Sequence, residues 1–330
     1  MLALTSLLLL LLPSCAREEA PANRLNVVFI IAEDLRPELA VNAREPFEDI
    51  GAGVGGAVAT PHVDRLAARS LVFDLAVAQV AVCAPSRASL LTGLRPDTLG
   101  IYDFQHFGAM RHFRTLLSHY NSKGYITSGS GKIFHYEASH HYSHHYYGDE
   151  WESLARAERR FQNSSVTPDA LHGDGFFRDA RIVGKAIEFL DSMHAQSERA
   201  RSATGRALPW FLAVGLKGTH MPYHMPTKYH ELYLGRAIRA GDAARLSFPP
   251  GAPLLHYSTK PEGARIDFMS GNGSRPWRER ESYLQNVNGD PRRARAVKRI
   301  SARGHAELYK GYLACLSYAD VNHTFAAPND

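Results

Sequence analysis

The sequence predicts an α/β fold in which a doubly wound, mostly parallel sheet is flanked by helices. Residues 26–31 and 210–215 are short apolar runs with the length and side-chain types of strands buried on both faces. Helix-start signals follow the first run and an apolar helical segment follows Cys83, so strands and helices alternate along the chain. The 330 residues, of which 45% are hydrophobic, can bury one large core or two small ones.

Residues 1–20 are predicted to be a signal peptide that precedes the fold. The leucine run at 7–12 has the length of a signal-peptide apolar region and is too short to span a bilayer, although no Lys or Arg precedes it. Residues 12–15 faintly resemble a bacterial lipoprotein cleavage box, so a lipid anchor stays an alternative. We therefore expect a protein of the secretory pathway, whether secreted, lysosomal or periplasmic, with no transmembrane segment.

Cysteine usage argues against a disulfide framework. Removal of the leader leaves Cys83 and Cys315. Because one of these two cysteines is a candidate functional residue, a disulfide framework is not expected. Asn163, Asn272 and Asn322 each begin an acceptor sequon, which predicts a glycoprotein if the source is a secretory eukaryote.

Two adjacent acids, Glu33 and Asp34, follow the first predicted strand. Open α/β sheets bind their ligands at the carboxyl ends of the strands, and carboxylate oxygens suit a hard divalent cation. The pair is therefore a candidate metal site, and a strand-end turn with solvated acids is the alternative.

A capped helix and a further strand are predicted next. Thr60 and Pro61 are residue types typical of an N-cap and a first helical position, and they predict a helix from residue 61. Residues 71–80 are an apolar run that predicts a strand leading directly into the turn at Cys83.

Cys83 lies where an apolar segment gives way to Pro85 and Ser86, with a helical run and Gly93 behind it. This places it at a predicted helix N-terminus, where unpaired backbone N–H groups favour a thiolate, an oxyanion or a bound sulfate or phosphate. Arg87 would project beside it. The alternative is a small buried hydrophobic residue before an ordinary helix.

Two later segments place cations and imidazoles at the ends of predicted strands. Residues 124–128 predict a strand, and the turn after it presents Lys132 and His135. The second buried strand is followed by Lys217 and His220. Such groups can bind an anion and transfer protons, whereas a surface lysine and ordinary loop histidines are the alternative.

Two segments have a biased composition. The histidine-rich residues 135–147 allow a transition-metal hypothesis, but a variable loop near the mouth of the site is favoured. Arginines between residues 265 and 303 contribute much of the formal net charge of +5, and predict either a rim that attracts an anionic polymer or a solvated surface. No segment resembles a nucleic-acid-binding module, so nucleic acid is not an expected partner.

The motif formed by Cys83, Pro85 and Arg87, with its continuation at 91–97, resembles the signature of type I sulfatases. Residues 81–87 and 101–104 resemble most the iduronate-2-sulfatase branch of that family. Glu33, Lys132, His135 and His220 then occupy places in the order that the family pattern requires.

The resemblance implies a sulfuric ester hydrolase that acts on a sulfated sugar. Cys83 would be converted by a formylglycine-generating enzyme into formylglycine, whose hydrated aldehyde is the nucleophile. Arg87 would hold that side chain, Lys132 and His220 would bind sulfate and assist the leaving alcohol, and His135 would help to release sulfate.

One calcium ion is also implied, bound by Glu33, Asp34 and the modified Cys83. Glu33 stands where the family usually has Asp. The added methylene keeps the charge of the ligand and alters its reach.

The resemblance implies an alkaline-phosphatase-like fold for a catalytic domain at 24–330 and ends near residue 320. A second acidic pair and the last sheet strands of the family are not matched, so the domain is expected to be incomplete at its carboxy end. Two alternatives follow: an inactive fragment or sulfated-glycan binder, and a phosphate or phosphonate ester hydrolase of the same superfamily.

Overall fold

The computed structural model describes residues 24–36, 39, 58–73, 75–102, 105–135, 146–147, 166–221, 223–236, 278–285, 295–300 and 302–322. The predicted signal peptide, the sequons at Asn163 and Asn272, and most of the histidine-rich and arginine-rich segments lie outside the described residues.

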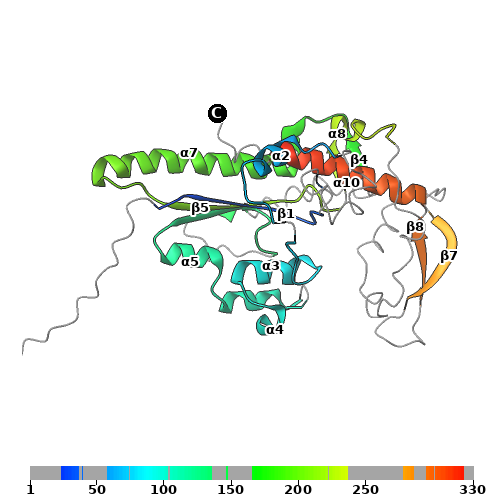
Figure 1. The fold of residues 1–330 in the computed structure, drawn as a ribbon, viewed down its shortest axis with the longest axis horizontal. Coiled ribbons are helices and arrows are strands. Elements are labelled where there is room, and N and C mark those ends of the chain that lie inside the picture. The colour runs from blue at the N-terminus through cyan, green and yellow to red at the C-terminus, as the bar shows by residue number, and fades with distance from the viewer. Residues whose placement is uncertain are drawn as a thin grey trace, which may run out of the picture.

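A four-stranded parallel sheet forms the centre of the fold, with the strand order β1-β5-β2-β3 (Figure 1). Its strands are β1 (Val27–Ala32), β5 (Trp210–Leu216), β2 (Ile126–Gly131) and β3 (Tyr146–Tyr147). The strands predicted at 26–31, 124–128 and 210–215 are therefore confirmed, with small shifts of their ends. Residues far apart in the chain lie side by side, since Val28 pairs with Leu212 and Ile126 with Trp210.

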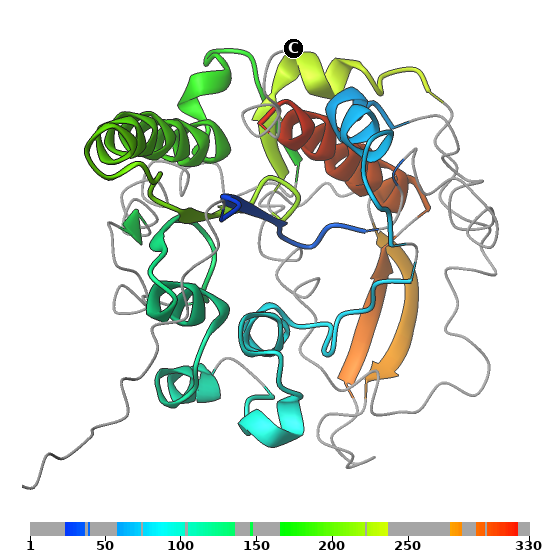
Figure 2. The same ribbon diagram turned by 60° about the vertical axis from the view of Figure 1, so that its left-hand side comes forward.

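Helices cover both faces of this sheet, as a doubly wound fold requires (Figures 1 and 2). Helix α7 (Arg178–Thr204) packs on one face, where it meets Leu212 and Val214 of β5. Helices α3 (Cys83–Thr92) and α5 (Leu116–Ser122) pack on the other face with Phe211 and Ala213. Because neighbouring residues of β5 enter opposite cores, this strand is apolar throughout.

A third core lies beside the sheet and is built on α10 (Ala302–Asn322). The helix packs on the parallel pair β4 (Val166–Asp169) and β6 (Tyr223–Pro226). The remaining elements are α2 (Pro61–Ala67), α4 (Pro96–Leu99), η2 (Gln105–His112), η5 (Asp174–Phe176), α8 (Thr227–Glu231) and the antiparallel pair β7 (Arg278–Gln285) and β8 (Arg295–Ile300). Within the described ranges, no helix is both long and apolar enough to cross a membrane.

Helix α2 begins after Thr60 with Pro61 in its first turn, which confirms both predicted positions. The Thr60 side chain makes no capping hydrogen bond. Instead, the buried Asp320 of α10 accepts hydrogen bonds from the backbone N–H groups of His62, at 3.1 Å, and Val63, at 2.8 Å. A carboxylate is a stronger acceptor than a hydroxyl and also complements the positive end of the helix dipole.

The strand predicted at 71–80 is also wrong, because these residues form no strand in the structure. Leu71, Phe73, Leu75 and Val77 are between 74% and 80% exposed. An apolar run becomes a strand only when a neighbouring strand satisfies its backbone groups and a packed face covers its side chains. No described residue supplies such a strand here.

Candidate active site

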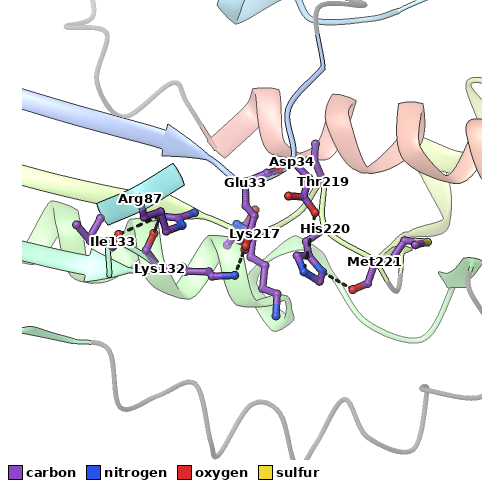
Figure 3. Close-up of polar contacts among 10 residues, drawn as sticks. Glu33, Asp34, Arg87, Lys132, Ile133, Lys217, Thr219, His220 and Met221 are labelled. Atoms are coloured by element: carbon purple, nitrogen blue, oxygen red, sulfur yellow. Dashed lines mark hydrogen bonds and ion pairs between the residues drawn. The ribbon is translucent and has the colours of Figure 1, made fainter. Parts of the chain in front are cut away.

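The carboxyl ends of β1, β2 and β5 meet at one edge of the sheet, because the three strands are parallel. Glu33 and Asp34 follow β1, Lys132 follows β2, and the turn that contains His220 follows β5 (Figure 3). Parallel topology therefore brings together side chains that are far apart in the sequence, since 99 residues separate Glu33 from Lys132 and 88 separate Lys132 from His220. This agrees with the expectation that open α/β sheets gather functional groups at the carboxyl ends of their strands.

Two glycines allow the ends of β2 and β5 to approach closely. The backbone N–H of Lys132 donates to the carbonyl of Gly215 at 3.0 Å. A Cβ atom on Gly215 would lie 1.9 Å from the Lys132 carbonyl oxygen. Gly131 has a φ of +77°, in the left-handed region that favours glycine, and a Cβ there would lie 2.3 Å from the Gly215 oxygen. Together the glycines position the backbone of Lys132.

Glu33 and Lys132 form a buried ion pair at the centre of the cluster (Figure 3). The Lys132 Nζ donates to Glu33 Oε1, and both side chains are almost completely buried. The other oxygen, Glu33 Oε2, is buried and has no hydrogen-bond partner among the described residues. Burial alone would raise the pKa of the Glu33 carboxyl, but Lys132, His220 and Arg87 outweigh it and hold that pKa below its ordinary value.

Asp34 and His220 lie beside this pair. Asp34 has a φ of 52°, a left-handed conformation that costs a non-glycine residue about 1–3 kcal/mol. This turn places its Oδ2 at 3.9 Å from His220 Nε2. The His220 Nδ1 is bonded to the Met221 carbonyl, which can only accept, so Nδ1 is the donor nitrogen of this ring and Nε2 faces Asp34.

Helix α3 begins at Cys83, as predicted, and ends before Gly93. Cys83 is half-buried in the first turn. One turn further, the buried Arg87 donates through Nη1 to the carbonyl oxygens of Lys132 and, at 3.1 Å, of Ile133 (Figure 3). The guanidinium therefore fixes the start of α3 against the segment that follows β2.

His135 belongs to the same cluster through its electrostatic surroundings. Burial lowers the pKa of its imidazole, and the Lys132, Arg87 and Lys217 cations lower it further, to about 4, against an opposing effect of Glu33. His135 is consequently neutral near physiological pH. A neutral imidazole can accept a proton.

Two residues of the cluster were missed by the sequence analysis. Asp179, in the first turn of α7, accepts hydrogen bonds from the N–H groups of Lys217 at 2.9 Å and Gly218 at 2.7 Å. The Thr219 hydroxyl donates to the Glu33 carbonyl. Both residues hold the turn after β5. An acid in the first turn of a helix is so common that nothing in the sequence singles out Asp179.

The residues fit a calcium ion in kind but are few in number. Carboxylates are the ligands that calcium prefers, and a cation would satisfy the buried Glu33 Oε2. Within the described part of the chain, no group of three or more His, Cys, Asp and Glu side chains gathers closely enough to hold a metal. Glu33 and Asp34 would therefore supply only part of the ligand set of such an ion, which needs further oxygen ligands.

Comparison with solved structures defines the fold class. The structure of a phosphonate monoester hydrolase of Agrobacterium radiobacter matches 92% of this chain and 58% of its own, with a TM-score of 0.54 and 16% sequence identity. With its parallel sheet and flanking helices, the fold is alkaline-phosphatase-like, as predicted.

Sequence comparison defines the family. A sulfatase family model matches residues 25–321. Iduronate 2-sulfatase of Mus musculus is 29% identical over 342 residues, which cover 97% of this chain and 54% of the relative. Iduronate 2-sulfatase of Homo sapiens is 32% identical over 266 residues, which cover 75% and 44%. The chain belongs to the sulfatase family and spans about half the length of these curated relatives.

Proposed function

We propose that this protein hydrolyses a sulfate ester on a sulfated sugar, in the manner of iduronate 2-sulfatases. The observation that carries the proposal is the convergence of Lys132, His220 and Arg87 on an acidic strand end, with Cys83 opening the adjoining helix, in a chain of the sulfatase family. Fixed cations around a nucleophile stabilise the charge that develops on a transferring sulfate and on its leaving oxygen.

Cys83 is the proposed precursor of the nucleophile. Conversion to formylglycine would supply a hydrated aldehyde whose oxygen can attack sulfur. This modification requires a formylglycine-generating enzyme as a partner. Arg87 keeps the helix start in place, since its guanidinium is bonded to two backbone carbonyls beyond β2.

Lys132 and His220 are the proposed sulfate-binding groups. The Lys132 ammonium is buried, and a cation in a site with little water binds an anion more strongly than a solvated one. In its protonated form, His220 can donate the Nε2 proton to the leaving alcohol while its Nδ1–H stays bonded to the Met221 carbonyl. His135, which is neutral, can take up the proton that is lost when sulfate is released.

One calcium ion is proposed to bind at Glu33, Asp34 and the modified Cys83. A bound cation lowers the pKa of a neighbouring hydroxyl and neutralises sulfate charge. The support for Glu33 as a ligand is its buried Oε2, which has no hydrogen-bond partner among the described residues. Lys132 occupies its other oxygen, so both cations can share this carboxylate.

A sulfated uronate in a glycosaminoglycan or another polysaccharide is the proposed substrate, and it rests on the names of the two relatives, iduronate 2-sulfatase. The phosphonate monoester hydrolase supports only the shared fold, at 16% identity. Cys83 with Pro85 and Arg87 favours sulfate over phosphonate. A secretory, lysosomal or periplasmic location is proposed on the leader and on the chemistry of such substrates.

Mass spectrometry of the tryptic peptide 70–87, combined with sulfate release from a sulfated uronate disaccharide, tests the proposal. We expect the mass of an aldehyde in place of the Cys83 thiol, and release of inorganic sulfate. Cys83→Ala should abolish release, and Cys315→Ala, which alters a buried cysteine of α10, is the matched control that should retain it. An unmodified Cys83 with no turnover would contradict the proposal and favour a glycan-binding role.

A further inference from the structure

Helix α10 borders the turn that contains His220. A Cβ atom on Gly218 of this turn would lie 3.5 Å from the Ala319 Cβ and 3.6 Å from the Cys315 carbonyl oxygen, so the helix and the turn are in direct contact. Figure 3 shows α10 running behind Asp34 and the turn. One turn before Cys315, about 5 Å along the helix axis, α10 therefore still lies beside the candidate active site.

Three tyrosines form a row at this place, which we call the tyrosine row (Tyr223, Tyr312 and Tyr309). The ring centroids of Tyr223 and Tyr312 are 6.1 Å apart at an interplanar angle of 71°. The ring centroids of Tyr312 and Tyr309 are 6.1 Å apart, with nearly parallel planes. Tyr312 is buried, and the two ends of the row are half-buried. Tyr223 is the first residue of β6 and follows His220 by three residues, so the row begins at the candidate active site.

Arg36 connects the tyrosine row to the acidic end of β1. It follows Asp34 by two residues, and its backbone N–H donates to the Tyr312 hydroxyl at 2.8 Å. Burial raises the pKa of the Tyr223 hydroxyl, and among the charged neighbours Asp34 raises this pKa further while Arg36 lowers it. The Arg36 side chain is exposed and lies within electrostatic reach of the Tyr223 hydroxyl.

A guanidinium beside aromatic rings is suited to an acidic sugar. The planar guanidinium can bind a carboxylate through two parallel N–H···O bonds. The C–H groups of a sugar ring carry small positive partial charges, so they pack favourably on the negative face of an aromatic ring. A uronate offers both kinds of contact, whereas a neutral sugar offers only the second.

We propose that Arg36 and the tyrosine row form a subsite for a uronate of the sulfated sugar, in which Arg36 binds the carboxylate and the half-buried rings of Tyr223 and Tyr309 pack against the sugar. The inference rests on the proposed function, because it names the part of the substrate that lies beside the sulfate. Since Arg36 follows Asp34 so closely, a uronate bound there keeps its sulfate near the end of β1.

Calorimetric binding to the full 330-residue chain with Cys83→Ala tests the subsite without turnover. The two probes are a disaccharide with a 2-sulfated uronate and the same disaccharide with its carboxylate reduced to an alcohol. Arg36→Met should weaken binding of the acidic disaccharide at least about tenfold, because it removes a charged hydrogen-bond partner. Binding of the reduced disaccharide should stay within about twofold. The substitution retains the backbone N–H that bonds to Tyr312.

Two further variants separate charge from geometry. Arg36→Lys should restore only part of the affinity, because an ammonium keeps the charge and loses the planar fork. Arg199→Met is the matched control, an exposed arginine on α7 that lies 20 residues after Asp179, about 30 Å along the helix. It should leave the binding of both disaccharides unchanged.

Tyr309 tests the aromatic part of the subsite. Tyr309→Ala should weaken binding of both disaccharides about fivefold, because the packing on the ring does not require the carboxylate. Tyr309→Phe keeps the ring and should bind both as the parent does. Melting temperatures of the two variants show whether the fold is retained. Equal binding by Tyr309→Phe and Tyr309→Ala would overturn the role of the ring.

The remaining outcomes distinguish the subsite from the proposed function. Equal weakening of both disaccharides by Arg36→Met would assign Arg36 to the sulfate and overturns the subsite, as does unchanged or absent binding of the acidic disaccharide. Sulfate release is measured separately on the chain with Cys83 intact. Release with a KM that Arg36→Met does not alter retains the proposed function and overturns the subsite. Binding that depends on Arg36, without any release, supports the subsite and contradicts the proposed function.

Discussion

The buried carboxylates among the described residues fall into two groups, which differ in how their oxygens are satisfied. Asp169, Asp179 and Asp320 accept hydrogen bonds on both oxygens, each of them from at least one backbone N–H group. Glu33 is bonded through Oε1 to the Lys132 side chain, and Oε2 has no partner among the described residues. The difference separates acids that hold backbone segments in place from an acid that can still accept a ligand.

The two groups of carboxylates differ in function because a buried carboxylate oxygen without a hydrogen-bond partner lowers the stability of the fold. Burial of a carboxylate without partners costs free energy, so native proteins rarely contain one unless a ligand or another group satisfies it. For the three aspartates the partners are already in the fold. For Glu33 the described structure supplies a partner for one oxygen, and the proposed cation would supply a partner for the other.

Asp320→Ala should cause the largest loss of stability. It removes two hydrogen bonds from a charged acceptor, each about 1.5–3 kcal/mol, and leaves the start of α2 uncapped, so we expect a loss of about 4 kcal/mol. Urea unfolding measures the change. Asp97→Ala, an exposed acid in the first turn of α4, should cost less than about 0.5 kcal/mol, and equal losses would contradict the role of Asp320.

Glu33→Gln should cause the second largest loss of stability. Unlike the loss caused by Asp320→Ala, it should be reversed by a second substitution. Removal of one partner leaves the buried Lys132 ammonium uncompensated, at a cost of about 3 kcal/mol. Glu33→Gln with Lys132→Met removes both charges and should return the free energy of unfolding to within about 1 kcal/mol of wild type.

The same double variant should release no sulfate, and calcium should no longer raise its melting temperature. Restored stability without restored activity would assign the pair to function, as the comparison requires. A double variant as unstable as Glu33→Gln would instead place Glu33 with the structural acids. Melting temperatures with and without calcium, alongside the sulfate assay, distinguish these results.

Asp179→Asn should have an intermediate effect. The amide oxygen can still accept one of the two backbone N–H groups, so about 1–2 kcal/mol of stability is lost. Because these bonds hold the turn that contains Lys217 and His220, KM for the sulfated sugar should rise as well. Asp191→Asn, an exposed site on the same helix, should change neither quantity.

The sequence predicted the sheet well where a strand is defined by its own residues. β1 and β5 are apolar on both faces, and that property is visible without knowledge of their neighbours. The same signal at residues 71–80 led to a wrong strand, because strand formation needs a partner that no described segment provides. Local pattern therefore predicts the potential to be a strand, and topology decides whether it becomes one.

In the candidate site, too, some residues could be predicted from local sequence and others could not. Glu33, Asp34, Lys132 and His220 could be predicted because each follows an apolar strand, and parallel strands bring their carboxyl ends together. The hydrogen bonds from the start of α2 to Asp320, 258 residues away from His62, have no local signal, although Thr60 and Pro61 correctly predicted where the helix begins. Contacts between distant elements are set by packing, which one sequence does not display.

The smallest expected effect is the pH dependence of stability that arises from His135. The linkage between proton binding and folding gives its sign. Its pKa is about 4 in the folded protein, against about 6.5 for an ordinary histidine, so between these values the unfolded chain binds a proton that the folded chain does not. Stability therefore falls as the pH drops from about 6.5 towards 4. His135→Gln should make the melting temperature less sensitive to pH between 7 and 5, and the exposed His194→Gln should leave the sensitivity unchanged. Equal slopes for wild type and His135→Gln would show that burial and the neighbouring cations do not lower the pKa of this imidazole in the folded protein.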